Sequence, residues 1–234
     1  YRPFSKQNFY FDANIIESPG KSKDLFLNEN KIIVVPGVGS KKEFSCLMIE
    51  SIPCLDMIEK GQCFPLYWYS VEDYNLLNNR KNKIIKHDGI SDSFLNKCRN
   101  KYNHAVCKED IFFYIYGILH SKQYRSTFED DLKKSLPNIP LVETYKDFEI
   151  FRDSGKKLSY LHLNYEIIEP YKDVKIIDYK KEDYTVKKMK FYKKDKSKII
   201  YNDYITIEDI PLKAYEYIVN GKSAIEWIMD RYQI

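Results

Sequence analysis

The sequence contains no long apolar stretch and no secretion signal. No run of about 18 apolar residues occurs, the length that a membrane-spanning helix needs. The amino terminus, YRPFSKQ, lacks the apolar region and the cleavage residues of a signal peptide. We therefore expect a globular, cytoplasmic protein with no membrane partner. Because the chain begins with Tyr1 rather than Met, we also expect it to be a piece of a longer polypeptide.

Cysteine frameworks and metal-site patterns are missing as well. The five cysteines form no C-x-x-C pair and are odd in number, which predicts neither a disulfide framework nor a zinc knuckle. Cys98, His104 and Cys107 are three conceivable ligands, but their spacing matches no common zinc pattern and no fourth ligand accompanies them. We expect no metal and no cofactor in this chain.

Glycine is scarce, and no glycine-rich phosphate-binding fingerprint is present. The segment KIIVVPGVGSKK runs from an apolar stretch into glycines and lysines. Its spacing fits neither G-x-x-x-x-G-K-[ST] nor the dinucleotide fingerprint, which needs a glycine where Lys42 stands. We interpret it as a turn between strands, whose backbone N–H groups can still hold a phosphate.

The sequence shows no catalytic constellation. Its four histidines are scattered, and no Ser-His-acid order stands out from chance. We expect His120 and His162 at helix ends, where they pack or face terminal carbonyls. Neither a glycine-rich cofactor loop nor an Asn/Asp-Pro-Pro-Tyr type motif of adenine methyltransferases is present. We expect this chain to bind a partner and to catalyse no reaction of its own.

One segment of the chain, residues 171–201, carries an excess of positive charge. The formal net charge is +4, whereas residues 171–201 alone hold eleven lysines and five acidic residues. Two interpretations stay open for this segment: a solvated sheet face, or a strip that faces phosphates.

The strongest structural signal lies in residues 110–166. Apolar residues recur at helical spacing until polarity changes at His120, and Ser121 can cap a second helix that continues to the segment PNIPL. Thr144 and Asp147 then form a capping pair for a third helix. The sequence therefore predicts a helical middle.

Strands are predicted at both ends of the chain. Region 1–70 is strand-rich, with NFYFD, KIIVV, EFSCLMIE and CFPLYWY as candidate strands. Region 71–166 contains loops and helices, and we interpret its residues 74–90 as a connecting loop. Region 167–234 holds VKIIDY, an exposed edge strand YTVKKMKFY, a hairpin tip KKDKS, KIIYNDYITI, and a last helix capped by Ser223 and Glu226. This order predicts an α+β domain, with mixed or antiparallel sheet segments at both ends enclosing the helical middle.

Seven segments in a fixed order give the chain a family resemblance. They are YRPF, KIIVVPGVGSKKEFS, CFPLYWY, GILHSKQYR, LPNIPL, SGKKLSYLHLNYE and IPLKAYEYIVNGKSAIEWIMDRYQ. Together they resemble the C-terminal specificity region of Type ISP restriction-modification enzymes over essentially the whole chain. Such enzymes are single polypeptides that join a nuclease, an ATP-driven translocase of the helicase type, an adenine methyltransferase and a target recognition domain.

The resemblance implies that the chain recognises a short asymmetric sequence in double-stranded DNA and presents its adenine to an upstream methyltransferase. S-adenosylmethionine, ATP and Mg²⁺ would then be cofactors of the parent enzyme's upstream domains. The alternative that we keep open is an intramolecular scaffold that docks on the methyltransferase and helicase domains without reading bases. On either view the recurring segments are scaffold, and we expect Tyr165 and Trp227 in the core.

Three groups of polar residues are the candidates for DNA contact, chosen because loops and helix starts expose their side chains and N–H groups. They are Ser40, Lys41 and Lys42 after the glycines; Arg80, Lys81 and Lys83 in the long loop; and Lys122, Gln123 and Arg125 in the first turn of the second central helix.

Overall fold

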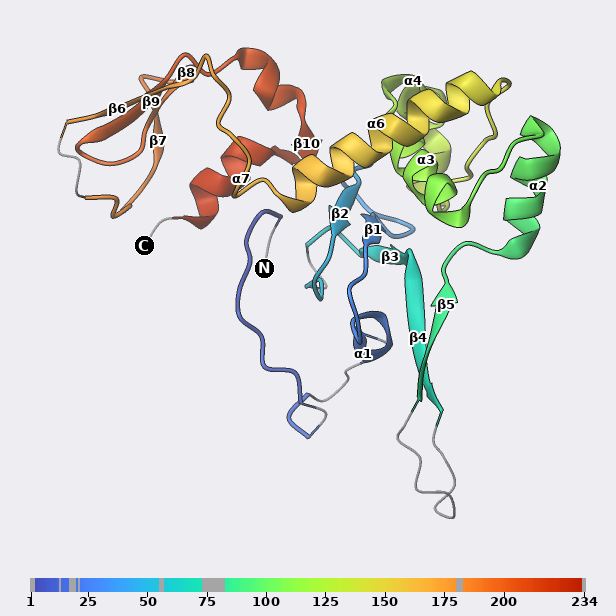
Figure 1. Ribbon diagram of the computed structural model, residues 1–234. Helices are drawn as coiled ribbons and strands as arrows, with labels where there is room; N and C mark the ends of the chain where they lie inside the picture. Colours follow the sequence, from blue (N-terminus) through green and yellow to red (C-terminus); the bar gives the residue numbers. More distant parts are fainter. Residues whose placement is uncertain are drawn as a thin grey trace.

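The computed structural model describes residues 3–12, 14–16, 20, 22–54, 57–72, 83–179 and 183–232. Antiparallel sheets lie toward both ends of the described chain, and helices occupy its middle (Figure 1). This arrangement confirms the predicted α+β class. Within the described residues, no helix is long and apolar enough to cross a membrane.

The first sheet follows a short helix, α1 (Ser22–Leu25). It has three antiparallel strands in the order β2-β1-β3: β1 (Ile32–Val35), β2 (Leu47–Ile49) and β3 (Gln62–Pro65). All four residues of the central strand β1 are buried, as its unbroken apolar run predicts. The strand expected at residues 8–12 is not formed, and that prediction was wrong. Its aromatic residues find no described strand to pair with.

A two-stranded hairpin, which we call the arm, consists of β4 (Tyr67–Glu72) and β5 (Lys83–Asp88). Figure 1 shows the arm standing off the rest of the molecule. The predicted loop at residues 74–90 was wrong for β5, because this strand pairs along its whole length with β4, from Tyr67↔Asp88 to Glu72↔Lys83. Residues 73–82 lie outside the described part of the chain.

The helical middle contains α2 (Asp92–Tyr102), α3 (Lys108–His120), α4 (Lys122–Thr127), α5 (Glu129–Lys134) and α6 (Tyr145–Leu163). The predicted caps are confirmed: Ser121 accepts from the N–H of Tyr124, and Thr144 accepts from that of Asp147. The second central helix was expected to run unbroken, which was wrong. Phe128 leaves helical geometry at φ −109° and ψ 22°, and so separates α4 from α5.

Helices α3 and α6 cross with their backbones in contact. A Cβ at Gly155 would lie 1.9 Å from the carbonyl oxygen of Phe113, and one at Gly117 would lie 2.1 Å from that of Phe151. Only glycine fits at either position. The largest cluster of buried side chains surrounds this crossing and includes Phe112, Tyr114 and Phe148.

The C-terminal sheet is antiparallel, in the order β6-β9-β8-β7. Its strands are β6 (Lys175–Asp178), β7 (Lys190–Tyr192), β8 (Asp195–Ile200) and β9 (Ile205–Glu208). The edge strand predicted at residues 184–192 forms only over its last three residues, so its predicted length was wrong, whereas its edge position and the hairpin tip after it are confirmed. Lys193 and Lys194 form this tip with φ of 46° and 68°, which suits the twist of a tight hairpin.

The chain then forms η1 (Leu212–Glu216), β10 (Ile218–Val219), β11 (Lys222–Ser223) and α7 (Ala224–Arg231), whose predicted Ser223–Glu226 capping box is confirmed. Trp227 is buried and donates its Nε1–H to the carbonyl of Val219 at 2.7 Å, as a core residue should. Tyr165 is only half-buried and packs edge-on against Phe4.

Candidate nucleic-acid interface

The turn that follows β1 holds a carboxylate of the protein itself. Oε2 of Glu59 accepts the Ser40 hydroxyl at 2.8 Å and the backbone N–H groups of Lys41 at 2.8 Å and Lys42 at 3.1 Å. These hydrogen bonds lower the pKa of Glu59, with that from Ser40 contributing most. The N–H groups that we expected to be free for a phosphate are therefore satisfied internally. What this turn offers to a partner is the exposed side chains of Lys41 and Lys42.

The candidate residues in the first turn of α4 point in two directions, some toward solvent and one toward the protein interior. The side chain of Lys122 is 90% exposed and pairs with Glu216 of η1 at 3.1 Å, and Gln123 is exposed. Arg125 instead turns inward: its Nε–H donates to the Leu119 carbonyl at 2.6 Å, and its guanidinium lies 5.5 Å from the ring centre of Phe44. This geometry favours a positioning role for Arg125, whereas Lys122 and Gln123 are available to a partner.

Behind α4 lies a buried cluster of aromatic and imidazole rings. His120 packs edge-on against Tyr116, and the Tyr116 hydroxyl shares a hydrogen bond with Nδ1 of His162. Burial, helped by the nearby Arg125 guanidinium, lowers the pKa of His120 to about 3 and that of His162 to about 4. Both imidazoles are therefore neutral near pH 7. They pack at helix ends, as the sequence predicted.

The arm exposes an aromatic surface. Trp68 stacks on His87 with ring centres 3.9 Å apart, and the Ser70 hydroxyl lies 2.8 Å from Nε2 of His87. Trp68 is 43% exposed despite its size. Of the three loop candidates, Lys83 begins β5 and is exposed, whereas Arg80 and Lys81 lie outside the described residues.

A buried asparagine fixes the base of the arm. The Nδ2–H₂ of Asn30 donates to the carbonyls of Leu25 at 2.8 Å and Tyr67 at 2.6 Å. Its Oδ1 accepts from the N–H groups of Tyr67 at 3.1 Å and Lys31 at 2.9 Å. Asn30 thus binds both the backbone N–H and the backbone carbonyl of Tyr67, the first residue of β4. The direction in which the arm leaves the body is consequently well determined.

A second anchor of the arm is ionic. Lys108, at the start of α3, pairs with Asp88 of β5 at 2.8 Å and with Asp92 of α2 at 2.6 Å. These contacts raise the pKa of Lys108, so the ammonium stays charged throughout the physiological range. The far strand of the arm is thereby tied to two helices.

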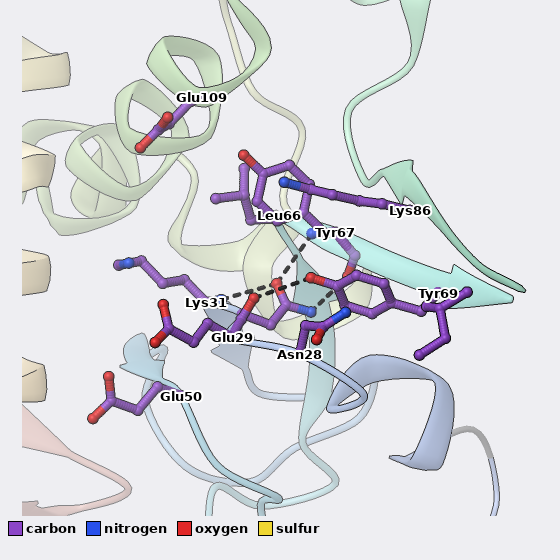
Figure 2. Close-up of a pocket in the computed structure, with 11 residues that line it drawn as sticks. Asn28, Glu29, Lys31, Glu50, Leu66, Tyr67, Tyr69, Lys86 and Glu109 are labelled. Atoms are coloured by element: carbon purple, nitrogen blue, oxygen red, sulfur yellow. Dashed lines mark hydrogen bonds between the residues drawn. The ribbon is translucent and has the colours of Figure 1, made fainter.

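A hollow of about 980 Å³ lies where the arm meets the body. Figure 2 shows Tyr67, Tyr69 and Lys86 of the arm facing Lys31 just before β1, Glu50 just after β2 and Glu109 of α3. The ammonium of Lys86 lies 3.3 Å from the ring centre of Tyr67. Lysines, carboxylates and amides in one hollow can both donate and accept hydrogen bonds, which is what reading base edges requires.

The structure brings two of the three predicted groups together. Lys42 lies beside Gly221, and Lys122 pairs with Glu216, so both groups border residues 216–221. Lys83 lies apart from them, on the arm. The stacked Trp68 and His87 and the hollow were missed from the sequence. The branched pair Ile84–Ile85 was the one signal that could have revealed β5.

Metal chemistry finds no support in the described residues, where no three His, Cys, Asp or Glu side chains are grouped as ligands. Cys107 caps α3 by accepting the N–H of Asp110. His104 stacks on Tyr145 with ring centres 3.9 Å apart. Two of the three conceivable zinc ligands thus have structural contacts of their own.

Solved structures with this fold are far larger proteins. The ATP-dependent Type ISP restriction-modification enzyme LlaBIII bound to DNA matches with a TM-score of 0.85 and 36% identity, over 100% of this chain and 15% of that one. A nuclease-deletion mutant of the Type ISP restriction-modification enzyme LlaGI, in complex with a DNA substrate mimic, matches with a TM-score of 0.79 and 35% identity, over 100% and 17%. The cryoEM structure of the DrdV–DNA complex matches with a TM-score of 0.84 and 27% identity, over 100% and 23%.

The fold and its occurrence as a small part of such proteins define a class, that of domains of larger restriction-modification enzymes. The family model of the Type ISP C-terminal specificity domain matches residues 1–234, and the chain belongs to this family. The resemblance inferred from the sequence is thereby confirmed. A search of curated proteins finds no match to the chain.

Proposed function

We propose that this chain is the target recognition domain of a Type ISP restriction-modification enzyme and reads a specific sequence in double-stranded DNA. Membership of the specificity-domain family and the likeness to enzymes solved with DNA support this function. Adenine methylation, ATP-dependent translocation and cleavage then belong to upstream domains of one cytoplasmic polypeptide, which use S-adenosylmethionine, ATP and Mg²⁺. The chain itself directs these activities and performs none of them.

The arm is the observation that carries this proposal. The major groove of B-DNA is about 12 Å wide and admits a two-stranded β-ribbon. The arm is such a ribbon, held at its base by Asn30 and Lys108 and exposing Trp68 with His87. Rigid support of an exposed pair of strands is what sequence reading needs, because contacts to base edges tolerate little displacement.

Among the candidate residues, exposure decides which we assign to DNA contact. Lys41, Lys42, Lys83, Lys122 and Gln123 present exposed side chains. We assign Ser40 and Arg125 to positioning, since Ser40 donates to Glu59 and Arg125 to Leu119. Arg80 and Lys81 stay in the contact proposal as neighbours of Lys83 in the sequence.

A scaffold role is the second candidate, and the outer surface of α6 favours it. Ile150 and Tyr160 of α6 and Ile167 beyond its end are between 54% and 80% exposed. Apolar side chains in such positions suit contact with another domain of the same polypeptide. This docking is compatible with DNA reading and becomes the sole function only if the chain fails to bind DNA.

Fluorescence anisotropy of a labelled mixed-sequence duplex tests the two candidates. The wild-type chain should bind in low salt, and Trp68→Ala on the arm should weaken binding more than Tyr160→Ala, which removes an even more exposed aromatic residue from α6. Equal affinities of the two variants would remove the arm from the interface. If the wild-type chain does not bind at about 50 mM salt, where non-specific binding is strongest, DNA reading by this chain is refuted and the scaffold remains.

A further inference from the structure

The C-terminal sheet carries a group of lysines that the recognition surface described above does not include. We call Lys187, Lys188, Lys190, Lys193 and Lys194 the lysine strip. All five are exposed, and they lie before, within and after β7. Among the described residues none of them meets an ion-pair partner, so the strip presents five uncompensated positive charges.

Other lysines of the same sheet are neutralised by the fold. Lys196 pairs with Glu226 of α7 at 3.0 Å, Lys175 pairs with Asp209 at 2.8 Å, and Lys198 pairs with Glu208 on the neighbouring strand. The sheet therefore has carboxylates for these side chains and leaves the strip without them. A charge excess that survives such pairing is available to an anionic partner.

Protection of a sheet edge does not explain the strip. Lysines on an edge strand discourage pairing with other chains, and β7 is an edge strand. This role concerns side chains on the strand itself, which here means Lys190 alone. Lys187 and Lys188 precede β7, and the other two form the hairpin tip. Four of the five charges therefore lie where edge protection does not require them.

Exposed tyrosines accompany the lysines. Tyr184 is 64% exposed, Tyr192 is 38% exposed, and the ammonium of Lys193 lies 5.1 Å from the ring centre of Tyr192. Lysine and tyrosine are both common donors to the phosphate oxygens of DNA. Residues 187–194 extend over at most about 23 Å at about 3.3 Å per residue. A duplex presents about seven phosphates per strand over that length, enough for every lysine to meet one.

We propose that the lysine strip binds the phosphate backbone of duplex DNA outside the recognised sequence, independently of base identity. This proposal rests on the DNA-binding function proposed above. Figure 1 shows the C-terminal sheet and the arm well separated from each other, so the two surfaces meet different parts of a duplex. The arm supplies specificity, and the strip adds affinity that salt weakens.

The test compares two fourfold variants of the 234-residue chain with equal loss of charge. One replaces Lys187, Lys188, Lys193 and Lys194 by alanine. The other replaces four exposed helix lysines that also lack a described ion pair, namely Lys97, Lys134, Lys146 and Lys157. Anisotropy of a labelled duplex of about 30 base pairs is measured from about 50 to 200 mM salt. Thermal melting followed by circular dichroism checks that both variants are folded.

The slope of log K for DNA binding against log salt concentration is negative, and the strip variant should make it shallower by about 3 to 4, because each lost phosphate contact removes about 0.9 from its magnitude. The helix variant should reduce it by less than about 1. Equal slopes for the two variants, with normal binding by the wild-type chain, would overturn the strip proposal alone and point to an acidic protein partner. Absence of binding by the wild-type chain would overturn the underlying function and the strip proposal with it.

Discussion

Replacing Asn30 by alanine is expected to lower the free energy of unfolding by about 3 kcal/mol. Asn30 is 6% exposed and makes three hydrogen bonds beyond its immediate neighbours, one to Leu25 and two to the distant Tyr67. Each such bond contributes about 1 kcal/mol net, and a buried group left without a partner costs about 1 to 3 kcal/mol. For a chain of this size, that loss corresponds to a melting temperature lower by roughly 10 °C.

Asn28→Ala is the matched control, because it makes the same chemical change two residues away. Asn28 is exposed at the rim of the same hollow (Figure 2), and its replacement should change stability by less than about 0.5 kcal/mol. Urea denaturation followed by far-ultraviolet circular dichroism measures both variants. If Asn30→Ala is as stable as Asn28→Ala, the hydrogen bonds at the base of the arm do not hold it, and the argument for a rigid arm is refuted.

Three further predictions concern the helical middle. Gly155→Ala should destabilise the protein by at least about 2 kcal/mol in thermal melting, because its methyl group would meet the Phe113 carbonyl oxygen 1.9 Å away; a neutral effect would show that α3 and α6 can separate freely. Arg125→Ala should lower the melting temperature clearly while Lys122→Ala does not, since only Arg125 turns inward; equal melting temperatures would return Arg125 to the surface. Burial lowers the pKa of His162 from its ordinary value of 6.5 to about 4, so below pH 6.5 the unfolded chain binds a proton there that the folded chain does not, and the free energy of unfolding should fall from pH 7 to pH 5. His162→Gln should make this pH dependence shallower. An unchanged profile would contradict the assignment.

Helix starts were predictable because their signals are local. The side chains of Ser121 and Thr144 each accept a hydrogen bond from the backbone N–H group three residues later, so a segment of four residues contains the whole interaction. The edge position of β7 was predictable for the same reason, since Lys190 and the lysines just before it mark an exposed edge without reference to a partner strand. Such elements depend little on what the rest of the chain does.

The arm and the failed strand at residues 8–12 show what local patterns omit. β5 is a strand because Lys83–Asp88 pairs with Tyr67–Glu72, and the letters KIIKHD lack the alternation that would mark a half-exposed strand. Residues 8–12 have strand-forming aromatics but no partner among the described strands. Pairing is a property of two segments, and the sequence of either one does not contain it.

The segment LHSKQYR, residues 119–125, contains both side chains that pack inside the protein and side chains that are exposed on its surface. His120 packs inward with its imidazole neutral, and Arg125 donates to the backbone of Leu119, whereas Lys122 and Gln123 are exposed. A recognition domain can change its target only if the residues that contact DNA can be replaced without unfolding the protein. Inward side chains at 120 and 125 fix the turn between α3 and α4, which leaves positions 122 and 123 free to vary. The inward residues of this segment are therefore poor candidates for reading bases, and the base-reading residues should be sought among exposed neighbours such as Lys122 and Gln123.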